Sequence, residues 1–225
     1  MNRIQDNPIL TPQQKALLSA FRKSPLKATF YLTGGTVLSA FYLQHRFSED
    51  LDFFSEQETG VEEILSFLNS LSGIRDVCFE KKFDRNLFLL AYPDTNVLKV
   101  EFTRYPFRRI EAGEQIEEIT VDSLKDILTN KLVAMTDRKD PKDYVDVYAI
   151  LKDRSDLPLS QIILLAETKF GVRGIGHILK GRFLEKIPRV DCLKLRQPVS
   201  QEELTVFYRN HAQRLIKISL KDNPK

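Results

Sequence analysis

Two aspartates separated by one residue carry the strongest chemical signal in the sequence. Asp50 and Asp52 lie in the segment SEDLDFF at residues 48–54, whose pattern predicts a β-strand over 49–54. Side chains two residues apart in a strand project to the same face. Neighbouring carboxylates repel each other unless a cation lies between them, and Mg²⁺ with a nucleoside triphosphate is such a cation. The pair therefore predicts a metal and nucleotide site, or else an acidic strand face exposed to solvent.

A third carboxylate, Glu101, lies in another predicted strand over 97–103. It is the only acid in that strand, where it shares one face with Lys99 and Thr103. Beside the aspartate pair it would complete a three-acid metal cage of the kind that two-metal phosphoryl transfer uses. A solvated acid on an exposed strand is the alternative interpretation.

The supply of other metal ligands limits which metal such a site could hold. Three histidines are scattered at positions 45, 177 and 211, and Cys78 and Cys192 form no CxxC pair. The sequence therefore offers almost no histidine or cysteine ligands for a zinc site, and any catalytic metal must take oxygen ligands. The expected cofactor is Mg²⁺ or Mn²⁺, with an NTP as substrate. The two cysteines suit free thiols in a reducing cytoplasm.

A glycine turn precedes the acids. Gly34-Gly35-Thr36 follows a predicted strand over 29–33 and opens a predicted helix over 36–44. Such a turn suits a phosphate, because glycine permits close backbone approach and the first N–H groups of a helix attract anions. The hydroxyls of Thr36 and Ser39 could add donors, and Arg46 could pair with a phosphate or with a neighbouring acid. The alternative is a simple chain reversal.

A lysine on the apolar side of a predicted helix is the next candidate. In the helix predicted over 121–138, Lys131 lies seven residues after Leu124 and four after Ile127, on the same side as both. A lysine there costs desolvation unless it meets an anion. Lys131 is therefore predicted to reach the nucleotide phosphates, unless its ammonium extends past the edge of the apolar stripe.

Two acids one helical turn apart follow in a helix predicted over 141–152. Asp140-Pro141 suits the N-cap and first helical position, and the helix dipole favours Asp143 in the first turn. Asp146 lies one turn further in, among apolar neighbours, and needs a basic partner or a catalytic purpose. The lysine of the preceding helix and Arg138 are candidate partners.

These residues are positioned by elements that the hydrophobic periodicity predicts. Strands are predicted over 29–33, 49–54, 76–83, 86–92 and 97–103, with a tight turn at Asp84-Arg85-Asn86, and helices over 11–23, 36–44, 61–72, 121–138, 141–152, 161–170, 174–184 and 200–217. The fold class is α/β (α+β): a small mixed sheet of about five strands with flanking helices, followed by a helical C-terminal region. We expect an α/β core over 1–115 and a helical region over 116–225 that completes the active-site cleft.

Charge is unevenly distributed along the chain. The net charge is +3, but residues 171–225 hold twelve Lys/Arg and five Asp/Glu, a net +7, whereas residues 1–170 carry −4. A basic segment beside an acidic body is compatible with a polyanion partner or with a merely solvated basic surface. No apolar run is long enough to span a membrane, and residues 1–6 lack a signal peptide's apolar stretch. We therefore expect a cytoplasmic protein with no membrane partner.

Together these residues resemble the AbiEii/AbiGii-type nucleotidyltransferase toxin family, a branch of the polymerase-β-like superfamily. The resemblance runs through LTGGT at 32–36, RFSEDLDFF at 46–54, NKLVA at 130–134, and Arg138 with KDYVD at 142–146. It covers roughly residues 30–150 well and the last third of the chain only loosely. The ordered set of motifs is specific, although each motif alone is weak.

The resemblance implies transfer of an NMP from an NTP to an acceptor hydroxyl. Relatives are typically toxins of bacterial toxin–antitoxin or abortive-infection systems, and some modify the acceptor end of tRNA. RNA is therefore the expected acceptor, and an antitoxin protein is an expected partner. The implied roles are triphosphate binding by Gly34, Gly35 and Thr36; metal binding by Asp50 and Asp52; phosphate contact by Lys131; and matches to the last family motif at Asp143 and Asp146, with Glu101 placed as the third acid by position.

Two other classes of function stay open from the sequence. One is a different phosphotransfer enzyme, such as a kinase or a nucleotidyltransferase that acts on a small hydroxyl compound. The other is a non-enzymatic module that keeps the fold and uses the basic segment to hold nucleic acid or a protein. Retention of the acids argues against the module, because a degenerate site has no use for them.

Overall fold

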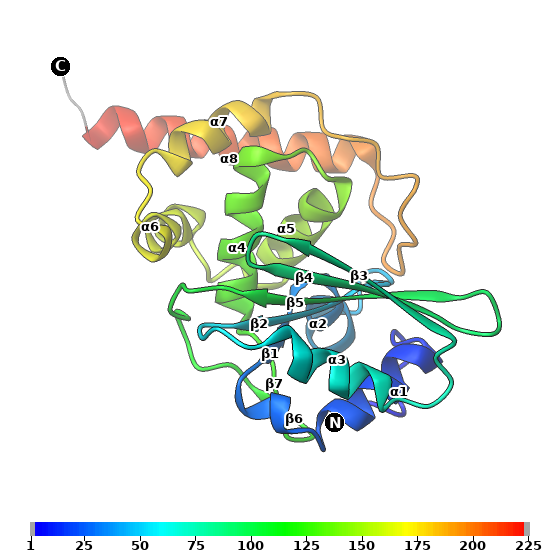
Figure 1. Cartoon of the computed structure of the whole chain (residues 1–225). Coiled ribbons are helices and arrows are strands. Elements are labelled where there is room, and N and C mark those ends of the chain that lie inside the picture. The colour runs from blue at the N-terminus through cyan, green and yellow to red at the C-terminus, as the bar shows by residue number, and fades with distance from the viewer. Residues whose placement is uncertain (1–2, 223–225) are drawn as a thin grey trace. The chain divides into compact units, whose positions relative to one another are not determined.

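The protein is described by a computed structural model over residues 3–222. The chain divides into two compact units, Met1–Ser123 and Leu124–Lys225. The first unit is built on a β-sheet, and the second is helical (Figure 1). The predicted order of an α/β region followed by a helical region is therefore confirmed.

A five-stranded mixed sheet forms the centre of the first unit. Its strands are β1 (Tyr31–Thr33), β2 (Leu51–Ser55), β3 (Asp76–Lys82), β4 (Arg85–Ala91) and β5 (Val97–Arg104). They are ordered β1-β2-β5-β4-β3, with β2 and β5 parallel and the other neighbours antiparallel. The sheet therefore places the aspartate strand β2 directly beside β5, which carries Glu101.

The helices of the first unit are α1 (Pro12–Phe21), the short 3₁₀ helix η1 (Pro25–Ala28), α2 (Gly34–Val37), the π-helix η2 (Leu38–Leu43) and α3 (Val61–Asn69). Helix α1 starts in a capping box, in which the Thr11 hydroxyl accepts from the Gln14 N–H and the Gln14 side chain accepts from the Thr11 N–H. Gln14 Nε2 also donates to the Ser48 carbonyl at 3.0 Å. The cap of α1 therefore holds the chain just before β2.

Alternating burial sets the orientation of β2. Leu51 and Phe53 are fully buried, whereas Asp52 between them is partly exposed and faces the other side of the sheet. Asp52 lies opposite Glu101 of β5 and opposite Thr33 of β1. Directly opposed residues on neighbouring strands share a face, so these polar side chains lie together on one side of the sheet.

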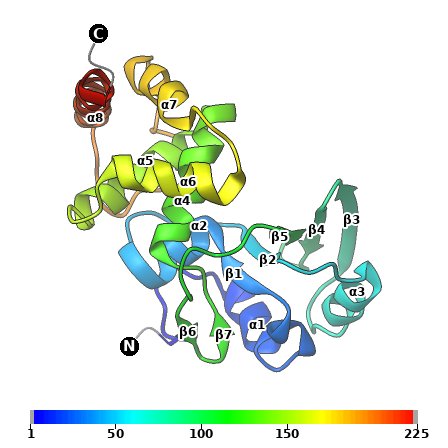
Figure 2. The same ribbon diagram turned by 90° about the vertical axis from the view of Figure 1, so that its left-hand side faces the viewer.

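The other side of the sheet is an aromatic core. The Phe53 ring stacks on Phe102 with centroids 4.8 Å apart and packs against Phe21 of α1 at 4.4 Å. Phe67 of α3 packs edge-on against Phe21 at 6.0 Å. Both helices lie on this side of the sheet (Figures 1 and 2). Burial of these rings fixes which face of β2 is apolar, and therefore which face the acids occupy.

The helix predicted over 36–44 is present, but its geometry changes along its length. It begins at Gly34 as α2 and continues as the π-helix η2, in which the Gln44 N–H donates to the Ser39 carbonyl at 3.0 Å. It ends at Gln44, which takes a left-handed conformation with φ 51°. Short π-helical turns of this kind are frequently found at functional sites.

The second unit contains α4 (Leu124–Asp137), α5 (Pro141–Asp153), α6 (Leu159–Phe170), α7 (Ile175–Leu184) and α8 (Gln201–Asp222). Asp140 caps α5, as predicted, by accepting from the Lys142 N–H at 2.9 Å. Buried Tyr208 of α8 donates to the Tyr144 carbonyl of α5 at 2.5 Å. Within residues 3–222 no helix combines the length and apolar character needed to cross a membrane.

Two local features differ from the sequence predictions. The turn predicted at Asp84-Arg85-Asn86 is wrong, because Arg85 and Asn86 pair within β4 and the turn is formed by Phe83 and Asp84. A hairpin of β6 (Gln115–Ile116) and β7 (Ile119–Thr120) was not predicted. This hairpin and a parallel bridge between Leu32 and Val121 belong to the first unit, which continues past the predicted boundary at 115/116 to Ser123.

Candidate functional site

The polar side of the sheet gathers charged residues from three neighbouring strands. They are Asp50 just before β2, Asp52 on β2, Lys99 and Glu101 on β5, and Arg85 on β4. The parallel pairing of β2 with β5 brings Asp52 and Glu101 into direct opposition, as the sequence predicted for a third acid beside the pair. We call these five residues the charged face.

Gly34 is the point at which the glycine turn meets the charged face. Its φ of +77° is one that residues with a Cβ rarely adopt. A Cβ built on Gly34 would overlap Asp52 Oδ2 and lie 3.1 Å from Asp52 Cγ. Glycine is therefore required here for two reasons, the backbone conformation and the close approach of the carboxylate.

The next residues of the turn contact the chain that leads into β2. A Cβ at Gly35 would overlap the guanidinium of buried Arg46 and lie 3.2 Å from Ser48 Oγ. The Thr36 hydroxyl donates to the Asp50 carbonyl. The glycine turn and the acidic strand are therefore tied together by direct contacts, although they are separated in the sequence by helical residues.

The three side chains predicted to bind phosphate, Thr36, Ser39 and Arg46, are all buried. Thr36 is fully buried, and its hydroxyl is engaged by the Asp50 carbonyl. Ser39 is also fully buried, and its Oγ has no hydrogen-bond partner among residues 3–222. Arg46 is 2% exposed and donates through Nη1 to the Phe47 carbonyl at 3.0 Å. Thr36 and Arg46 therefore hold in place the backbone segment that leads into β2.

Asp50 forms an ion pair with Lys99. Lys99 Nζ lies 3.2 Å from Asp50 Oδ2, and both side chains are 34% exposed. At this exposure the pair is screened by solvent and contributes little to stability. Its importance is geometric, because it directs the Asp50 carboxylate along the charged face and supplies a cation beside it.

Glu101 is held by three hydrogen bonds from neighbouring side chains. Arg85 donates to its carboxylate through Nε at 2.7 Å and Nη2 at 2.6 Å, and Thr103 Oγ1 donates at 2.6 Å. Burial alone would raise the pKa of Glu101, but the bonds from Arg85 and Thr103 outweigh it and hold the pKa below its ordinary value. Glu101 is therefore ionised, and its charge is compensated by Arg85.

The donor set of the charged face suits a hard divalent cation. Asp50 and Asp52 offer carboxylate oxygens on one side of β2, and Mg²⁺ is usually bound by one or two carboxylates together with substrate phosphates. Within the part of the chain that the structure describes, no group of three His, Cys, Asp or Glu side chains is arranged to hold a metal ion. The aspartate pair therefore fits a cation whose shell is completed by phosphate oxygens.

The second unit contains an ion cluster at the residues that sequence analysis singled out there. Lys131 Nζ lies 2.8 Å from Asp143 Oδ1 and 2.8 Å from Asp146 Oδ2. Arg138 donates to Asp143 through Nε at 2.8 Å. Both acids are fully buried, and the Lys131 side chain is 12% exposed. The prediction that Lys131 and Arg138 are the basic partners of these acids agrees with these contacts.

The cluster holds Asp143 in its charged form. Burial would raise the pKa of Asp143, but the charge and hydrogen bonds of Lys131 and Arg138 outweigh burial and hold the pKa below its ordinary value. A buried carboxylate without such partners would be costly. Lys131 therefore compensates the negative charges of the two buried carboxylates, Asp143 and Asp146.

Sequence reasoning missed several residues that hold these regions in place. Arg85 and Lys99 gave no motif, because their roles depend on strand register. Buried Asp122 accepts from the Thr33 hydroxyl at 2.7 Å, just before Gly34. In the second unit, the side chain of Lys169 is 2% exposed and pairs with buried Asp126 at 2.7 Å. A charged residue on the apolar stripe of a predicted helix is the one signal that could have indicated this last pair.

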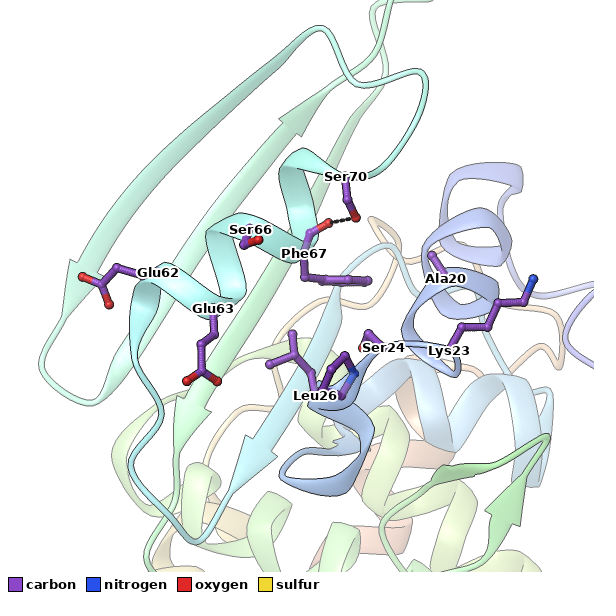
Figure 3. Close-up of a pocket in the computed structure, with 10 residues that line it drawn as sticks. Ala20, Lys23, Ser24, Leu26, Glu62, Glu63, Ser66, Phe67 and Ser70 are labelled. Atoms are coloured by element: carbon purple, nitrogen blue, oxygen red, sulfur yellow. Dashed lines mark hydrogen bonds between the residues drawn. The ribbon is translucent and has the colours of Figure 1, made fainter.

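A separate cavity lies on the aromatic side of the sheet. It has a volume of about 810 Å³, and α1, η1 and α3 line it with apolar residues that include Leu26 and Phe67 (Figure 3). Glu62, Glu63 and Lys23 lie among the lining residues. None of the predicted site residues contributes to this cavity. It is therefore distinct from the charged face, which lies on the other side of β2.

The sheet and its charged face define a nucleotidyltransferase fold. Two crystal structures from Helicobacter pylori share it. A candidate nucleotidyltransferase matches with a TM-score of 0.64 and 23% identity, over 96% of this chain and all of that one. The protein JHP933 matches with a TM-score of 0.61 and 23% identity, over 94% of this chain and 97% of that one.

The profile of the family described as "Nucleotidyl transferase AbiEii toxin, Type IV TA system" matches residues 16–221. The chain therefore belongs to the AbiEii nucleotidyltransferase toxin family, and it is a nucleotidyltransferase. The uncharacterized protein aq_aa25 of Aquifex aeolicus (strain VF5) is 33% identical over 184 residues, which are 80% of this chain and 85% of that protein. The resemblance predicted from the motifs is confirmed, and it extends into the C-terminal helices.

Proposed function

We propose that the protein transfers a nucleoside monophosphate from an NTP to a hydroxyl of an RNA acceptor, such as tRNA, and that the transfer depends on Mg²⁺ or Mn²⁺. Asp50 and Asp52 are the proposed metal ligands. The backbone at Gly34, Gly35 and Thr36 is the proposed site of the triphosphate. The observation that carries the proposal is the seating of the Asp52 carboxylate against Gly34. It brings the proposed metal ligand Asp52 close to a backbone segment suited to phosphate.

The reaction itself is a displacement at phosphorus. The acceptor oxygen forms a bond to the α-phosphorus of the NTP, the bond from that phosphorus to the bridging oxygen of the β-phosphate breaks, and pyrophosphate leaves. The hydroxyl proton passes to water. A bound divalent cation would supply compensation of the triphosphate charge. Asp50 and Asp52 would hold it, while Lys99 places a further positive charge beside Asp50.

Glu101, Lys131, Asp143 and Asp146 stay predicted site residues. A metal-binding role for Glu101 would require Arg85 to release its carboxylate. A phosphate contact by Lys131 would likewise require it to leave one of its two acids. Substitutions at these positions therefore need a stability readout beside the activity readout.

An RNA acceptor is supported by the charge of the C-terminal segment. Residues 171–225 carry a net charge of +7. Arg209, Arg214 and Lys217 are exposed on α8. Clustered basic side chains give the sequence-independent attraction to phosphate that nucleic-acid binding requires. As a member of a type IV toxin family, the protein is proposed to act as a toxin with an antitoxin partner, in the cytoplasm where RNA acceptors are available.

NTPs labelled at different phosphates distinguish nucleotidyl transfer from phosphoryl transfer and so test the proposed function. Purified protein is incubated with total tRNA, Mg²⁺ and each of the four NTPs, labelled at either the α- or the γ-phosphate, with and without EDTA. We expect label from the α-phosphate alone to enter RNA, and EDTA to abolish it. Transfer of the γ-label would establish a phosphotransferase instead. Incorporation that withstands EDTA would overturn the metal dependence.

A further inference from the structure

We propose that the tip of the β3–β4 hairpin binds an unpaired nucleobase of the acceptor RNA, with the Phe83 ring as its stacking surface. The identification of the acceptor as RNA rests on the function proposed above. Binding of single-stranded RNA by the tip can nevertheless be measured without catalysis.

The stability of the fold does not explain why an aromatic residue stands at position 83. Its side chain is 97% exposed, and its φ of +55° lies in the left-handed region. Two-residue hairpin turns favour asparagine or glycine at positive φ, because a Cβ is strained there. A bulky aromatic ring at this position gains no burial within residues 3–222. The chain therefore places a costly residue at an exposed point.

The hairpin gives Phe83 a rigid base. Strands β3 and β4 pair continuously from Asp76–Ala91 to Lys82–Arg85. Phe79 of β3 stacks on Phe88 of β4 with ring centroids 4.9 Å apart. The Arg104 N–H donates to the Asp84 carbonyl at 2.9 Å, which ties the turn to β5. A ring on a supported turn can stack on a ligand without first becoming ordered.

Beside Phe83 lies a small polar hollow of about 50 Å³. Its lining includes Phe83, Thr59, Lys81, Asn86 and Arg104. Thr59 Oγ1 and Asn86 Oδ1 are buried and have no hydrogen-bond partner among the described residues. Buried polar atoms are normally satisfied, so these two offer bonds to a ligand that approaches along the ring.

This combination suits a nucleobase with its phosphate. A base has a flat ring that stacks on Phe83 and a polar edge that can bond to Thr59 and Asn86, and the hollow can take only such an edge. Lys81 supplies positive charge for the phosphate, whereas Arg104 is paired with Asp84 at 3.6 Å. A purely apolar protein partner or a lipid surface fits less well, because every residue from Lys81 to Arg85 except Phe83 is charged.

The tip is also connected to the charged face. Arg85, the first residue of β4 after the turn, holds Glu101, and Glu101 lies opposite Asp52. Asn86 lies opposite Phe102, so the hollow is on the aromatic side of this sheet and the charged face is on the other side. RNA that uses both would pass around the hairpin tip, where Phe83 lies.

Fluorescence anisotropy with a labelled single-stranded oligoadenylate and a blunt RNA duplex of equal length tests the proposal. Phe83→Gly removes the ring and suits the left-handed turn, so it should not unfold the hairpin. We expect it to weaken single-strand binding by about 5- to 100-fold and to change duplex binding little. Phe83→Tyr should bind as wild type does. Val97→Ala, which trims an exposed side chain at the other end of β5, is the matched control.

Undiminished single-strand binding by Phe83→Gly would overturn the proposal, as would equal losses on single strand and duplex. Absence of single-strand binding by the wild type would also overturn it. Failure of the proposed function has a different signature, in which Phe83 governs RNA binding while no α-label enters the RNA.

Discussion

The carboxylate of Asp52 lies in the space that a Cβ at Gly34 would occupy, because Oδ2 would overlap such an atom and Cγ would lie 3.1 Å from it. Two segments that are separated in the sequence by the helical residues α2 and η2 are therefore fitted to each other at the start of β2. Any side chain at position 34 displaces either the backbone turn or the acid. The glycine and the aspartate thus form one structural unit.

Replacement of Gly34 by alanine should cost both stability and activity. The left-handed conformation costs about 1–2 kcal/mol for a residue with a Cβ, and the displaced Asp52 adds to that cost. Gly73→Ala is a matched control, since Gly73 has φ +82° and nothing within 4 Å of a built Cβ. Urea unfolding and α-label transfer are measured for both variants. Equal effects of the two substitutions on both readouts would show that Asp52 is not displaced.

Arg85→Ala should destabilise the protein at neutral pH by an amount that shrinks in acid. In the wild type the pKa of Glu101 is held down, so its stabilising contribution is present above the unfolded pKa of about 4.3 and is lost as pH falls through the folded value. Without Arg85 this contribution is missing at neutral pH, and burial of the charged carboxylate is left less compensated, whereas protonation in acid removes the difference. Urea unfolding followed by circular dichroism at neutral pH and at about pH 3 measures the difference from wild type.

Arg75→Ala serves as the control, because Arg75 is exposed and the backbone bond from its N–H to the Ala91 carbonyl does not depend on the side chain. The free energy of unfolding of Arg85→Ala should lie below that of Arg75→Ala at neutral pH and approach it in acid. A difference that is the same at both pH values would mean that Arg85 does not set the ionisation of Glu101.

Lys131→Met should destabilise the helical unit strongly. It leaves Asp146 without its ion-pair lysine and Asp143 with Arg138 alone, and breaking a buried pair costs roughly 3–5 kcal/mol. Because the lowered pKa of Asp143 makes its contribution largest above about pH 4, the difference from wild type should shrink in acid. Urea unfolding at neutral and acidic pH measures it, with exposed Lys142→Met as control. A loss that is independent of pH would exclude this explanation.

The parts of the fold that could be predicted from the sequence are those set by local periodicity. The alternation of Leu51, Asp52 and Phe53 gave the faces of β2, and the apolar stripe of α4 placed Lys131 on the side where Asp143 and Asp146 lie. In each case burial of neighbouring apolar residues fixes the orientation of the charged one.

The parts that could not be predicted depend on pairing between distant segments. The contact of Arg85 with Glu101 requires the register of β4 with β5, which no local pattern states. Turn propensity favoured Asp84-Arg85-Asn86, but the β3–β4 register overrode it and put Phe83 into the left-handed position. Asp122 looked unremarkable because its partner Thr33 is far away in the sequence.

The rate of α-label transfer by Asp52→Asn tests the central claim most directly. The substitution keeps the size of the side chain and removes the charge that would bind the metal. Asp76→Asn, at an exposed acid at the start of β3, is the control. We predict that Asp52→Asn lowers the initial rate with saturating Mg²⁺-NTP by about 100-fold or more while Asp76→Asn keeps it. Wild-type rates for a folded Asp52→Asn protein would contradict a nucleotidyl-transfer site built on Asp50 and Asp52.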